Sequence, residues 1–587
     1  MTDQVPTTRK PDARPAEPWR QRLIRSLLYG RNVDRAAKAR ARVGLAMIAF
    51  GGIYGIIAFR LVMFAVAGDT HAERRATRDA VATARPDIVD RNGAVLATDV
   101  KSPSLFSEPR RIIDKDEAVE LLTAALPDLD SAEVRERLSN KKGFAWLKRD
   151  ISPQQQRDIH RLGIPGIGFL RENKRVYPSG PAVSHLIGLV NIDNQGIAGI
   201  EKWLDTNGLA DLHRAGFASD RLQKPVELAV DLRVEHALRD ELMKAKDKYK
   251  AKAASGLVSN VRTGEIVAMV SLPDFDPNNP KEAHDPDRIN RLTTGVYEMG
   301  STFKTLTLAM ALDSGKVNLN TMFDARYPLS YGKFKIHDTH PVPRPISLSE
   351  VFTFSSNVGA AKIALGQGVE AHKAFLKKVG QLDRLRTELP ESAMPIVPKR
   401  WAELNTITIA FGHGIAVAPL QAVMGINAMV NGGLLIPPTF LKRTEEEALA
   451  LGKRVVKKDT SDKVRYMMRL NAEVGSARQA EAKAKGYYLG GKTGTAEKVV
   501  NGRYSKKQVL NSFTAVLPMD NPQFQVLVML DEPKALPETH GFITSGWNAV
   551  PTGGNVIARI APLLGLEPRF DLAPSDRLIL AASRATQ

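Results

Sequence analysis

The feature that most constrains this chain is an apolar run near its N-terminus. Residues 43–68 contain one charged side chain, that of Arg60. A helix that crosses the hydrocarbon core of a bilayer needs about 20 mostly apolar residues, so this run predicts a transmembrane helix over residues 43–67. Residues 1–42 hold eleven Lys or Arg against four Asp or Glu, and basic flanks stay on the cytoplasmic side. We therefore expect a cytoplasmic N-terminus and a large domain outside the membrane.

A cleaved signal peptide is the alternative interpretation of this run, because residues 65–67 read Ala-Val-Ala, like a cleavage site. The long basic leader and the length of the run favour an uncleaved anchor, since the apolar part of a signal peptide spans only about 7–15 residues. Gly51 and Gly55 form a G-x-x-x-G pattern, which permits close packing of two membrane helices. Glycine is common in membrane helices, so a helix-packing interface here is one of two alternatives.

The remaining composition excludes several kinds of site. The chain has 587 residues and no cysteine, which rules out a thiol nucleophile, disulfides and Cys-ligated zinc or iron–sulfur centres. Its formal charge of +19 is compatible with a polyanionic partner. No zinc-finger spacing, RNA-binding aromatic signature or helix-turn-helix pattern accompanies that charge. We expect two or three domains and no nucleic-acid partner.

Patterning predicts an α+β chain with two regions beyond the membrane helix. The polar region is expected to contain helices at 116–126 and 131–140 and a hairpin turn at residues 90–93, where Asn-Gly favours positive φ at both central positions. The larger domain is expected to hold an antiparallel sheet with strands from both of its ends and helices inserted between them. Its predicted elements are a helix at 233–253, a hairpin over 256–272 that turns at 262–264, helices at 301–313 and 404–432, strands at 510–520 and 523–533, and a helix at 552–565.

The domain boundaries follow from these patterns. We expect a basic cytoplasmic tail at 1–42, the transmembrane helix at 43–67, a polar domain at 68–224, a larger domain at 225–570 and a C-terminal tail at 571–587.

Ser-x-x-Lys occurs three times, and at most one copy is catalytic. The copies are Ser301/Lys304 in "YEMGSTFK", Ser139/Lys142 and Ser330/Lys333. Residues three apart share a helix face, so a hydroxyl and an amine in this spacing can act as nucleophile and base. The alternative is an ordinary helix start with the serine as N-cap. The pattern alone does not decide between them.

Two further patterns follow Ser301 in order. Ser355-x-Asn357 comes 54 residues after Ser301, and Lys492-Thr493-Gly494-Thr495 begins 137 residues after Ser355. Each motif alone also fits a helix cap, a polar turn or a strand followed by a turn. The ordered trio resembles the signature of the penicillin-binding proteins and serine β-lactamases. Three motifs in order favour acyl transfer at Ser301.

The resemblance implies a role for each catalytic residue. Ser301 is the nucleophile, Lys304 is the base that takes its proton, and Ser355 relays that proton to the leaving amine. Asn357 orients Lys304 and the substrate amide. Lys492 is the second cation that, together with burial, lowers the pKa of Lys304 so that its amine is neutral.

The same resemblance implies the substrate contacts. Thr493, Gly494 and Thr495 belong to the strand that binds the carboxylate of a stem peptide ending in D-alanyl-D-alanine, and the two threonines hold that carboxylate. The backbone N–H groups of Ser301 and Thr495 form the oxyanion hole. No metal or cofactor is implied.

Other stretches are similar to class B, monofunctional penicillin-binding proteins. "RPDIVDRNGAVLA" resembles the start of their non-catalytic domain, with Pro86 in place of the usual glycine, and "RVYPSGPAVSHLIGLV" and "GIAGIE" belong to the same domain. Met299 stands where many relatives have proline. "IAFGHGIAVAPLQ" (409–421) is similar to the cell-division branch, the penicillin-binding protein 3 type, whereas the elongation branch more often has "GQG" there. The resemblance covers residues 80–562.

The resemblance therefore implies a D,D-transpeptidase that is anchored in the bacterial inner membrane by one helix. Its elongated non-catalytic pedestal and its β-lactamase-like catalytic domain would lie in the periplasm. It would cross-link peptidoglycan stem peptides at the division septum and be acylated by β-lactams. No glycan-polymerising motif is present, so the expected partners are a membrane-embedded glycan polymerase and other division proteins.

Three alternatives remain open. A β-lactamase needs a water-activating base, but the class A Glu-x-x-Leu-Asn motif is broken, because Trp401 stands where the glutamate would precede Leu404-Asn405, and the class C Tyr-x-Asn motif is absent. A membrane scaffold or β-lactam sensor without turnover would not need the intact trio, and the chain has no His-Glu-x-x-His protease motif. An elongation-type class B transpeptidase is separated from the division type by family resemblance alone.

Overall fold

The structure is a computed structural model that describes residues 19–21, 23–24, 35–66, 85–139, 143–208, 224–500 and 502–571. The chain divides into two compact units, Met1–Thr83 and Ala84–Gln587. Most of the expected tail at 1–42 and nearly all of the tail at 571–587 lie outside the described residues, as does the end of the Ala-Val-Ala sequence.

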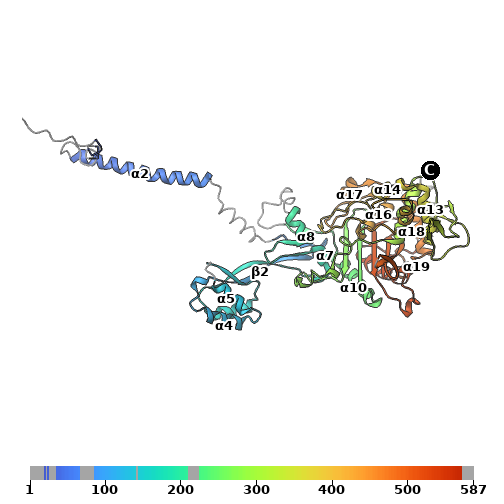
Figure 1. Cartoon of the computed structure of the whole chain (residues 1–587), viewed down its shortest axis with the longest axis horizontal. Helices are drawn as coiled ribbons and strands as arrows, with labels where there is room; N and C mark the ends of the chain where they lie inside the picture. The colour runs from blue at the N-terminus through green and yellow to red at the C-terminus, as the bar shows by residue number, and fades with distance from the viewer. Residues whose placement is uncertain are drawn as a thin grey trace, which may run out of the picture. The chain divides into compact units, whose positions relative to one another are not determined.

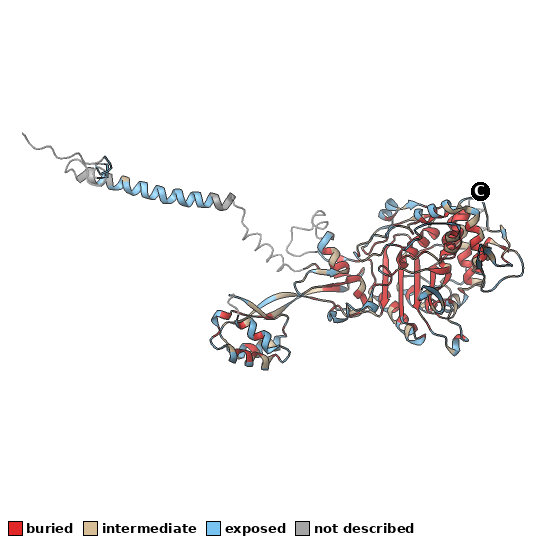
Figure 2. Cartoon of the chain, viewed as in Figure 1, coloured by how far each residue is buried: buried red, intermediate tan, exposed pale blue. Residues whose placement is uncertain are grey.

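The first unit contains one long helix, α2 (Arg35–Val66). Its segment Arg42–Leu61 is long and apolar enough to cross a membrane, and Figure 2 shows the coloured part of this helix as almost entirely exposed. Exposed apolar side chains such as Ile48 and Phe50 are stable on a helix that is surrounded by lipid. A Cβ atom added at Gly51 or Gly55 would meet nothing within 4 Å, so both glycines leave open space beside the helix. This unit is consistent with a single-pass anchor.

The second unit begins with a five-stranded sheet. Its strand order is β3-β2-β1-β7, with β4 on the other edge of β2. β2 and β4 pair as an antiparallel ribbon over residues 98–107 and 167–176. The bounds are β1 (Ile88–Val89), β2 (Val95–Ser107), β3 (Ala145–Lys148), β4 (Ile167–Val176) and β7 (Val226–Glu227).

Three helices pack on one end of this ribbon around a small core (Figure 1). They are α4 (Lys115–Ala125), α5 (Ser131–Ser139) and α6 (Pro153–Arg161). Asp114 starts α4 by accepting hydrogen bonds from the N–H groups of residues 116 and 117, and Ser152 and Gln155 form a reciprocal capping box at α6. The helices predicted at 116–126 and 131–140 are confirmed.

The hairpin turn between β1 and β2 differs from its prediction in one detail. Gly93 has a φ of 85°, but Asn92 does not adopt positive φ. The buried Asp90 carboxylate instead closes the turn, because its Oδ1 accepts from the N–H groups of Asn92 and Ala94, both at 2.8 Å. A side chain that bonds the backbone two residues ahead supplies the turn without a second left-handed residue.

The larger part of the second unit is built on an antiparallel sheet with the order β16-β17-β18-β8-β9. Strands from both ends of this part are thus neighbours, and Figure 2 shows them buried. The strands read as near-continuous apolar runs because helices cover both faces. The bounds are β8 (Ala253–Asn260), β9 (Ile266–Leu272), β16 (Gly490–Val500), β17 (Arg503–Leu517) and β18 (Phe524–Asp531).

Two hydrophobic cores sandwich this sheet. α10 (Leu232–Lys248) and α20 (Ala549–Leu563) pack on one face, while α11 (Lys304–Asp313), α16 (Pro419–Val430) and α18 (Lys458–Val474) contribute to the core on the other. The predicted α+β class is confirmed. Among the described residues of the second unit, the remaining α-helices are α7 (Ser184–Ile187), α8 (Gly199–Trp203), α12 (Leu348–Thr353), α13 (Asn357–Gln367), α14 (Val369–Lys378), α15 (Glu403–Ile409), α17 (Glu445–Leu451) and α19 (Arg478–Lys483). The remaining strands, all two or three residues long, are β5 (Leu189–Val190), β6 (Gly196–Ala198), β10 (Met322–Phe323), β11 (Leu329–Tyr331), β12 (Phe334–Ile336), β13 (Ile346–Ser347), β14 (Leu434–Leu435) and β15 (Lys453–Arg454).

Two predicted helices are wrong in extent. The helix expected over 404–432 is two helices, α15 and α16, because Gly412 and Gly414 between them have φ angles of 85° and 84°, which a helix does not accommodate. The helix expected over 233–253 ends at Lys248. Residue 253 already belongs to β8, so tertiary sheet pairing overrides the local Lys/Ala pattern there.

Candidate active site

The sequence trio is brought together where strand β16, at one edge of the sheet, meets the start of α11. Ser301 lies in η6 (Gly300–Phe303), a 3-10 turn that leads directly into α11, and Lys304 is the first residue of α11. Ser355 follows α12, and Asn357 opens α13. Lys492 lies in β16, whose chain packs against η6. The five side chains therefore come from three stretches of the chain that are distant in sequence, 301–304, 355–357 and residue 492.

Lys304 is the centre of this group. Its Nζ lies 2.8 Å from Ser301 Oγ, 2.8 Å from the Ser355 carbonyl oxygen, 3.2 Å from Ser355 Oγ and 2.7 Å from Asn357 Oδ1. Asn357 Nδ2 donates to the His337 carbonyl oxygen at 3.2 Å, which turns Oδ1 toward the amine. The spacing of Ser301 and Lys304 thus places them in direct contact, as the shared helix face predicted.

The contacts of Lys304 define how a neutral amine would be oriented. A neutral amine has two N–H donors and one lone pair. The Ser355 carbonyl oxygen and Asn357 Oδ1 can only accept, so they take both donors. The lone pair then faces Ser301 Oγ, as a base for that hydroxyl requires.

The electrostatic setting favours that neutral form. Lys304 has no exposed surface, and burial lowers its pKa well below the ordinary value of 10.5. The positive charge of Lys492 lowers the pKa of Lys304 further, while the negative charge of Asp338 opposes the shift. Both influences expected from the sequence, burial and a second cation, act in the expected direction.

Ser355 lies between the two lysines. Lys492 Nζ is 2.9 Å from Ser355 Oγ and the Lys492 side chain is fully buried, which lowers its pKa to about 7. Ser355 itself has a φ of 58°, a left-handed conformation that a non-glycine residue adopts only when its surroundings impose it. This conformation directs both its hydroxyl and its carbonyl oxygen at Lys304. The Ser355 hydroxyl lies within hydrogen-bond distance of both lysine amines, so it can pass a proton between the Lys304 side and the Lys492 side of the site.

The β16 residues differ in what their side chains contact. Thr493 Oγ1 is 2.9 Å from Ser476 Oγ, and Thr495 Oγ1 accepts from the Ser545 N–H at 3.1 Å. At Gly494 an added Cβ would lie 2.3 Å from Ser512 Oγ and 2.6 Å from the Met299 carbonyl oxygen. Glycine is therefore required for β16 to approach the chain that precedes the nucleophile.

The backbone behind Ser301 is equally close. A Cβ atom added at Gly300 would lie 3.1 Å from the Thr495 carbonyl oxygen and 3.3 Å from the Thr495 nitrogen. The peptide groups at Ser301 and Thr495, expected to form the oxyanion hole, therefore adjoin one another. That role stays a prediction.

Asp338 is a site residue that the sequence did not indicate. Its carboxylate accepts from Ser356 Oγ at 2.5 Å and from the backbone N–H groups of Asn357 and Val358 at 2.5 and 2.9 Å. An anion at a helix N-terminus is stabilised by the unpaired N–H groups there, so Asp338 fixes the start of α13 and with it Asn357. It precedes Ser356 by 18 residues, and nothing in the sequence pattern connects the two.

The other two Ser-x-x-Lys copies have different surroundings. Ser330 is exposed in β11, which forms a two-stranded hairpin with β12, so it shares no helix face with Lys333. Ser139 ends α5, and Lys142 lies outside the described residues.

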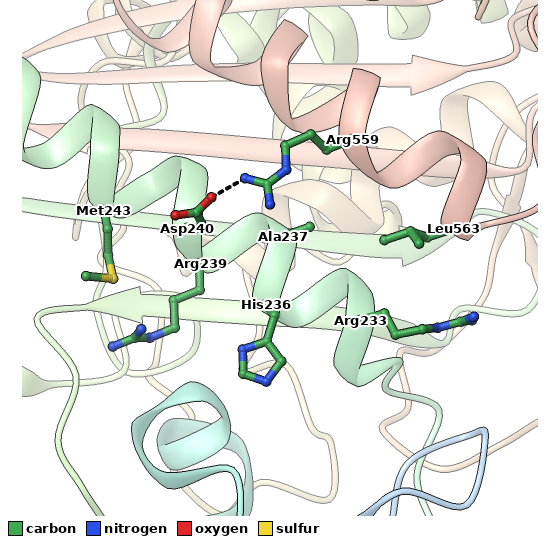
Figure 3. Close-up of a pocket in the computed structure, with 8 residues that line it drawn as sticks. All are labelled: Arg233, His236, Ala237, Arg239, Asp240, Met243, Arg559 and Leu563. Carbon is green, nitrogen blue, oxygen red and sulfur yellow. Dashed lines mark hydrogen bonds and ion pairs between the residues drawn. The ribbon is translucent and has the colours of Figure 1, made fainter.

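A cavity of about 570 Å³ lies between α10 and α20, on the face of the sheet opposite α11 (Figure 3). Its arginines are already paired: Arg233 with Asp231 at 2.6 Å, Arg239 with Asp274 at 2.7 Å, and Arg559 with Glu241 at 2.7 Å and with Asp240. The predicted site residues are not among those that line it. Within the described ranges, no cluster of three or more His, Asp or Glu side chains is placed to hold a metal ion.

Comparison with known proteins assigns both parts of the second unit to families. Residues 254–545 match the penicillin binding protein transpeptidase domain, and residues 80–206 match the penicillin-binding protein dimerisation domain. The probable peptidoglycan D,D-transpeptidase FtsI of Caulobacter vibrioides is 38% identical over 496 residues, which cover 83% of each chain.

Two further relatives and one solved structure are also similar to this chain. The peptidoglycan D,D-transpeptidase FtsI of Escherichia coli is 30% identical and covers 83% of this chain and 85% of its own. Stage V sporulation protein D of Bacillus subtilis is also 30% identical, over 83% of this chain and 79% of its own. A solved peptidoglycan synthetase from Bifidobacterium adolescentis has the same fold, with a TM-score of 0.63 at 21% identity over 84% of this chain and 98% of that one.

Proposed function

Because this chain belongs to the penicillin-binding protein transpeptidases, we propose that it is the enzyme that cross-links peptidoglycan stem peptides at the division septum. The chain is a peptidoglycan D,D-transpeptidase, and that family membership implies peptide substrates and β-lactam binding. The proposal adds the residues that perform the reaction, the place where it occurs and the partners it needs.

In the proposed reaction, Ser301 Oγ attacks the carbonyl carbon of the penultimate D-alanine while Lys304 takes the hydroxyl proton. Ser355, between the two lysines, passes that proton to the nitrogen of the terminal D-alanine, which leaves. An amine from a neighbouring stem peptide then attacks the acyl-enzyme, and Ser301 regains a proton. Thr493 and Thr495 hold the carboxylate of the terminal D-alanine, and Gly494 allows β16 to lie close to the chain that precedes Ser301. Lys492 adds positive charge near this carboxylate.

The observation that carries these roles is the environment of the Lys304 amine. In the neutral amine, both N–H groups donate to atoms that can only accept, and the lone pair faces Ser301 Oγ, which lies 2.8 Å from Lys304 Nζ. Burial and Lys492 lower the pKa of Lys304, so the amine acts as a base and not as a structural cation.

Ser301→Ala tests the nucleophile. It removes one oxygen atom, so it should abolish covalent labelling by fluorescent penicillin while leaving the thermal unfolding temperature within a few degrees of wild type. Ser330→Ala is the matched control, because Ser330 is exposed and begins another copy of the Ser-x-x-Lys pattern. This variant should be labelled by fluorescent penicillin at the wild-type rate. Labelling of Ser301→Ala at the wild-type rate would reject the assignment.

The septal role rests on the two FtsI relatives and on the Gly-His-Gly sequence at 412–414. An elongation-type enzyme is the second candidate, because the relatives also include a stage V sporulation protein. A fluorescent fusion expressed at native level should concentrate at mid-cell in dividing cells. A fusion dispersed along the side wall at all stages would reject the septal role.

We further infer that α2 anchors the chain with its N-terminus in the cytoplasm and the catalytic unit outside, because the basic residues precede the helix. A membrane-embedded glycan polymerase and other division proteins are the proposed partners, and Gly51 and Gly55 offer a surface for close helix packing. Gly51→Leu combined with Gly55→Leu should reduce cross-linking in the presence of the polymerase and leave penicillin labelling intact. Unchanged cross-linking would reject this interface.

A further inference from the structure

Three side chains from three segments meet just before the nucleophile and take no part in the reaction described above. Glu298 precedes Ser301 by three residues, His413 lies in the loop between α15 and α16, and Tyr504 lies in β17. Glu298 Oε1 accepts from the Gly414 N–H at 2.8 Å and from the Tyr504 hydroxyl at 3.0 Å. The carboxylate thus ties the loop and the β16–β17 hairpin to the chain that enters η6.

The second oxygen of this carboxylate is unused. Glu298 Oε2 and His413 Nε2 are both buried without a hydrogen-bond partner among the described residues, and they lie 4.0 Å apart. A buried polar atom without a partner is costly, so their proximity calls for an explanation. At this distance the two atoms form no hydrogen bond, and one would form only if the imidazole turned toward Oε2. The His413 side chain is 26% exposed and that of Glu298 19%, so the ring is the more accessible member of the pair.

The pair stands beside the nucleophile in space as well as in sequence. Gly412, next to His413, accepts a hydrogen bond from the Gly300 N–H at 3.3 Å, and a Cβ atom added at Gly412 would lie 2.0 Å from the Gly300 carbonyl oxygen. Burial lowers the pKa of His413 to about 4, and the positive charge that Lys304 carries when it is protonated lowers this pKa further. The imidazole is therefore neutral near pH 7 and within electrostatic reach of Lys304.

In the second half of the reaction, one more proton is released than Ser301 Oγ takes back, and this surplus proton has to reach solvent. An aliphatic amine has a pKa of about 10, so the acceptor arrives as an ammonium and loses two protons. The proton released as the amide forms returns through Ser355 and Lys304 to Ser301 Oγ, whose bond to the acyl carbon breaks. The other proton has to leave first, because an ammonium has no lone pair. The positive charge of protonated Lys492, whose pKa is about 7, repels a second cation, so a proton acceptor outside the lysine group would favour the loss of this proton.

We propose that His413 and Glu298 form the subsite for the acceptor amine of the cross-linking step, where the ammonium of a neighbouring stem peptide gives up its first proton. The proton passes through the partly exposed imidazole of His413 to solvent, and Nε2–H of the transient imidazolium donates to Glu298 Oε2. The carboxylate holds the ring in one tautomer and stabilises its charge. His413 is the catalytic residue of this step and Glu298 its positioning residue.

This inference rests on the roles proposed for Ser301 and Lys304, and its test separates the two. Full-length enzyme in detergent is acylated by a thioester donor that mimics the D-alanyl end of the stem, and products of two acceptors are compared. D-Alanine arrives as an ammonium near neutral pH, whereas hydroxylamine arrives unprotonated. Penicillin labelling reports on Ser301 and Lys304 and does not involve an acceptor.

Glu298→Gln keeps an oxygen that accepts from the Gly414 N–H and the Tyr504 hydroxyl but removes the charge, and His413→Gln removes the imidazole. Each should lower the ratio of D-alanine to hydroxylamine aminolysis by about tenfold or more. Glu446→Gln makes the same change at an exposed glutamate of α17 and should keep the wild-type ratio. If Glu298→Gln fails to label with penicillin, the substitution has damaged the acylation site. The aminolysis ratio of His413→Gln then decides whether the proposal holds.

The pH profile supplies a second readout. The charged or titratable groups near His413 are Glu298, Lys304 and Tyr504, and Glu497 lies near Tyr504. D-Alanine aminolysis by Glu298→Gln should reach its maximum at higher pH than in wild type, because the amine then depends on solvent to lose its proton. An unchanged ratio in both labelled variants, or an equal loss with both acceptors, would overturn the proposal.

Discussion

Replacing Lys492 by methionine tests the electrostatic design of the site most directly. Lys492 is fully buried, and its Nζ donates to Ser355 Oγ at 2.9 Å and to the Thr493 carbonyl oxygen at 3.3 Å. Burial lowers its pKa from 10.5 to about 7, whereas in the unfolded chain the pKa stays near 10.4. Methionine has a similar length and no charge, so it removes the titration while filling most of the volume.

The size of the effect follows from this pKa difference. One pKa unit is worth about 1.4 kcal/mol, so the buried ammonium lowers the free energy of unfolding by about 5 kcal/mol when fully protonated. The penalty is absent above the unfolded pKa near 10.4, grows as the pH falls, and is complete below the folded pKa of about 7. Wild-type protein should lose about 3 kcal/mol from this group between pH 9 and pH 6. Against this, Lys492→Met forfeits two hydrogen bonds, each worth about 1 kcal/mol.

The assay is thermal unfolding of the full chain in detergent at both pH values. Lys492→Met should unfold several degrees higher than wild type at pH 6, and its unfolding temperature should change less between pH 6 and pH 9. Penicillin labelling should fall sharply, because Ser355 loses its partner and Lys304 loses the cation that lowers its pKa. Lys316→Met, at an exposed lysine, should retain the wild-type pH dependence. A Lys492→Met variant with the pH dependence of wild type would refute this reasoning.

Two further substitutions probe the backbone and the charge around Lys304. Gly412→Ala places a Cβ atom 2.0 Å from the Gly300 carbonyl oxygen at a φ of 85° and should slow penicillin acylation by about tenfold or more. Gly432→Ala is the control, because this glycine has a similar φ of 88° but no atom within 4 Å of an added Cβ. Equal acylation rates in the two variants would show that the contact between Gly412 and Gly300 does not matter for acylation. Asp338→Asn removes the negative charge that raises the pKa of Lys304, so the acid limb of the acylation–pH profile should move to lower pH; a move to higher pH would show that this charge does not act on Lys304.

The predictions that succeeded from sequence concern local pattern. The apolar run at 43–68 predicted α2 because a lipid-spanning helix needs only length and composition. The helices expected at 116–126 and 131–140 form as α4 and α5, and alternating or continuous apolar runs marked the strands β8, β9, β17 and β18. These features depend on neighbours within a few residues, so the sequence contains the physical information that decides them.

The predictions that failed or were incomplete depend on contacts distant in sequence. The interruption between α15 and α16 exists because the loop at Gly412 packs against Gly300, more than 100 residues earlier. The turn at Asp90 is closed by a side chain that also accepts from the Leu232 N–H at 3.1 Å. A helix or turn propensity summed over adjacent residues does not include such contacts.

The same division applies to the active site. The sequence by itself determined the identity and order of the three motifs, and the spacing that puts Ser301 and Lys304 on one helix face. Only the tertiary structure decided which Ser-x-x-Lys is buried, because Ser330 has the same spacing and is exposed. It also decided that Lys492 meets Ser355 across 137 residues of chain, that Asp338 caps α13, and that Glu298 meets His413. Burial and the distance between charges set the pKa values on which the chemistry depends, and both quantities exist only after the chain has folded.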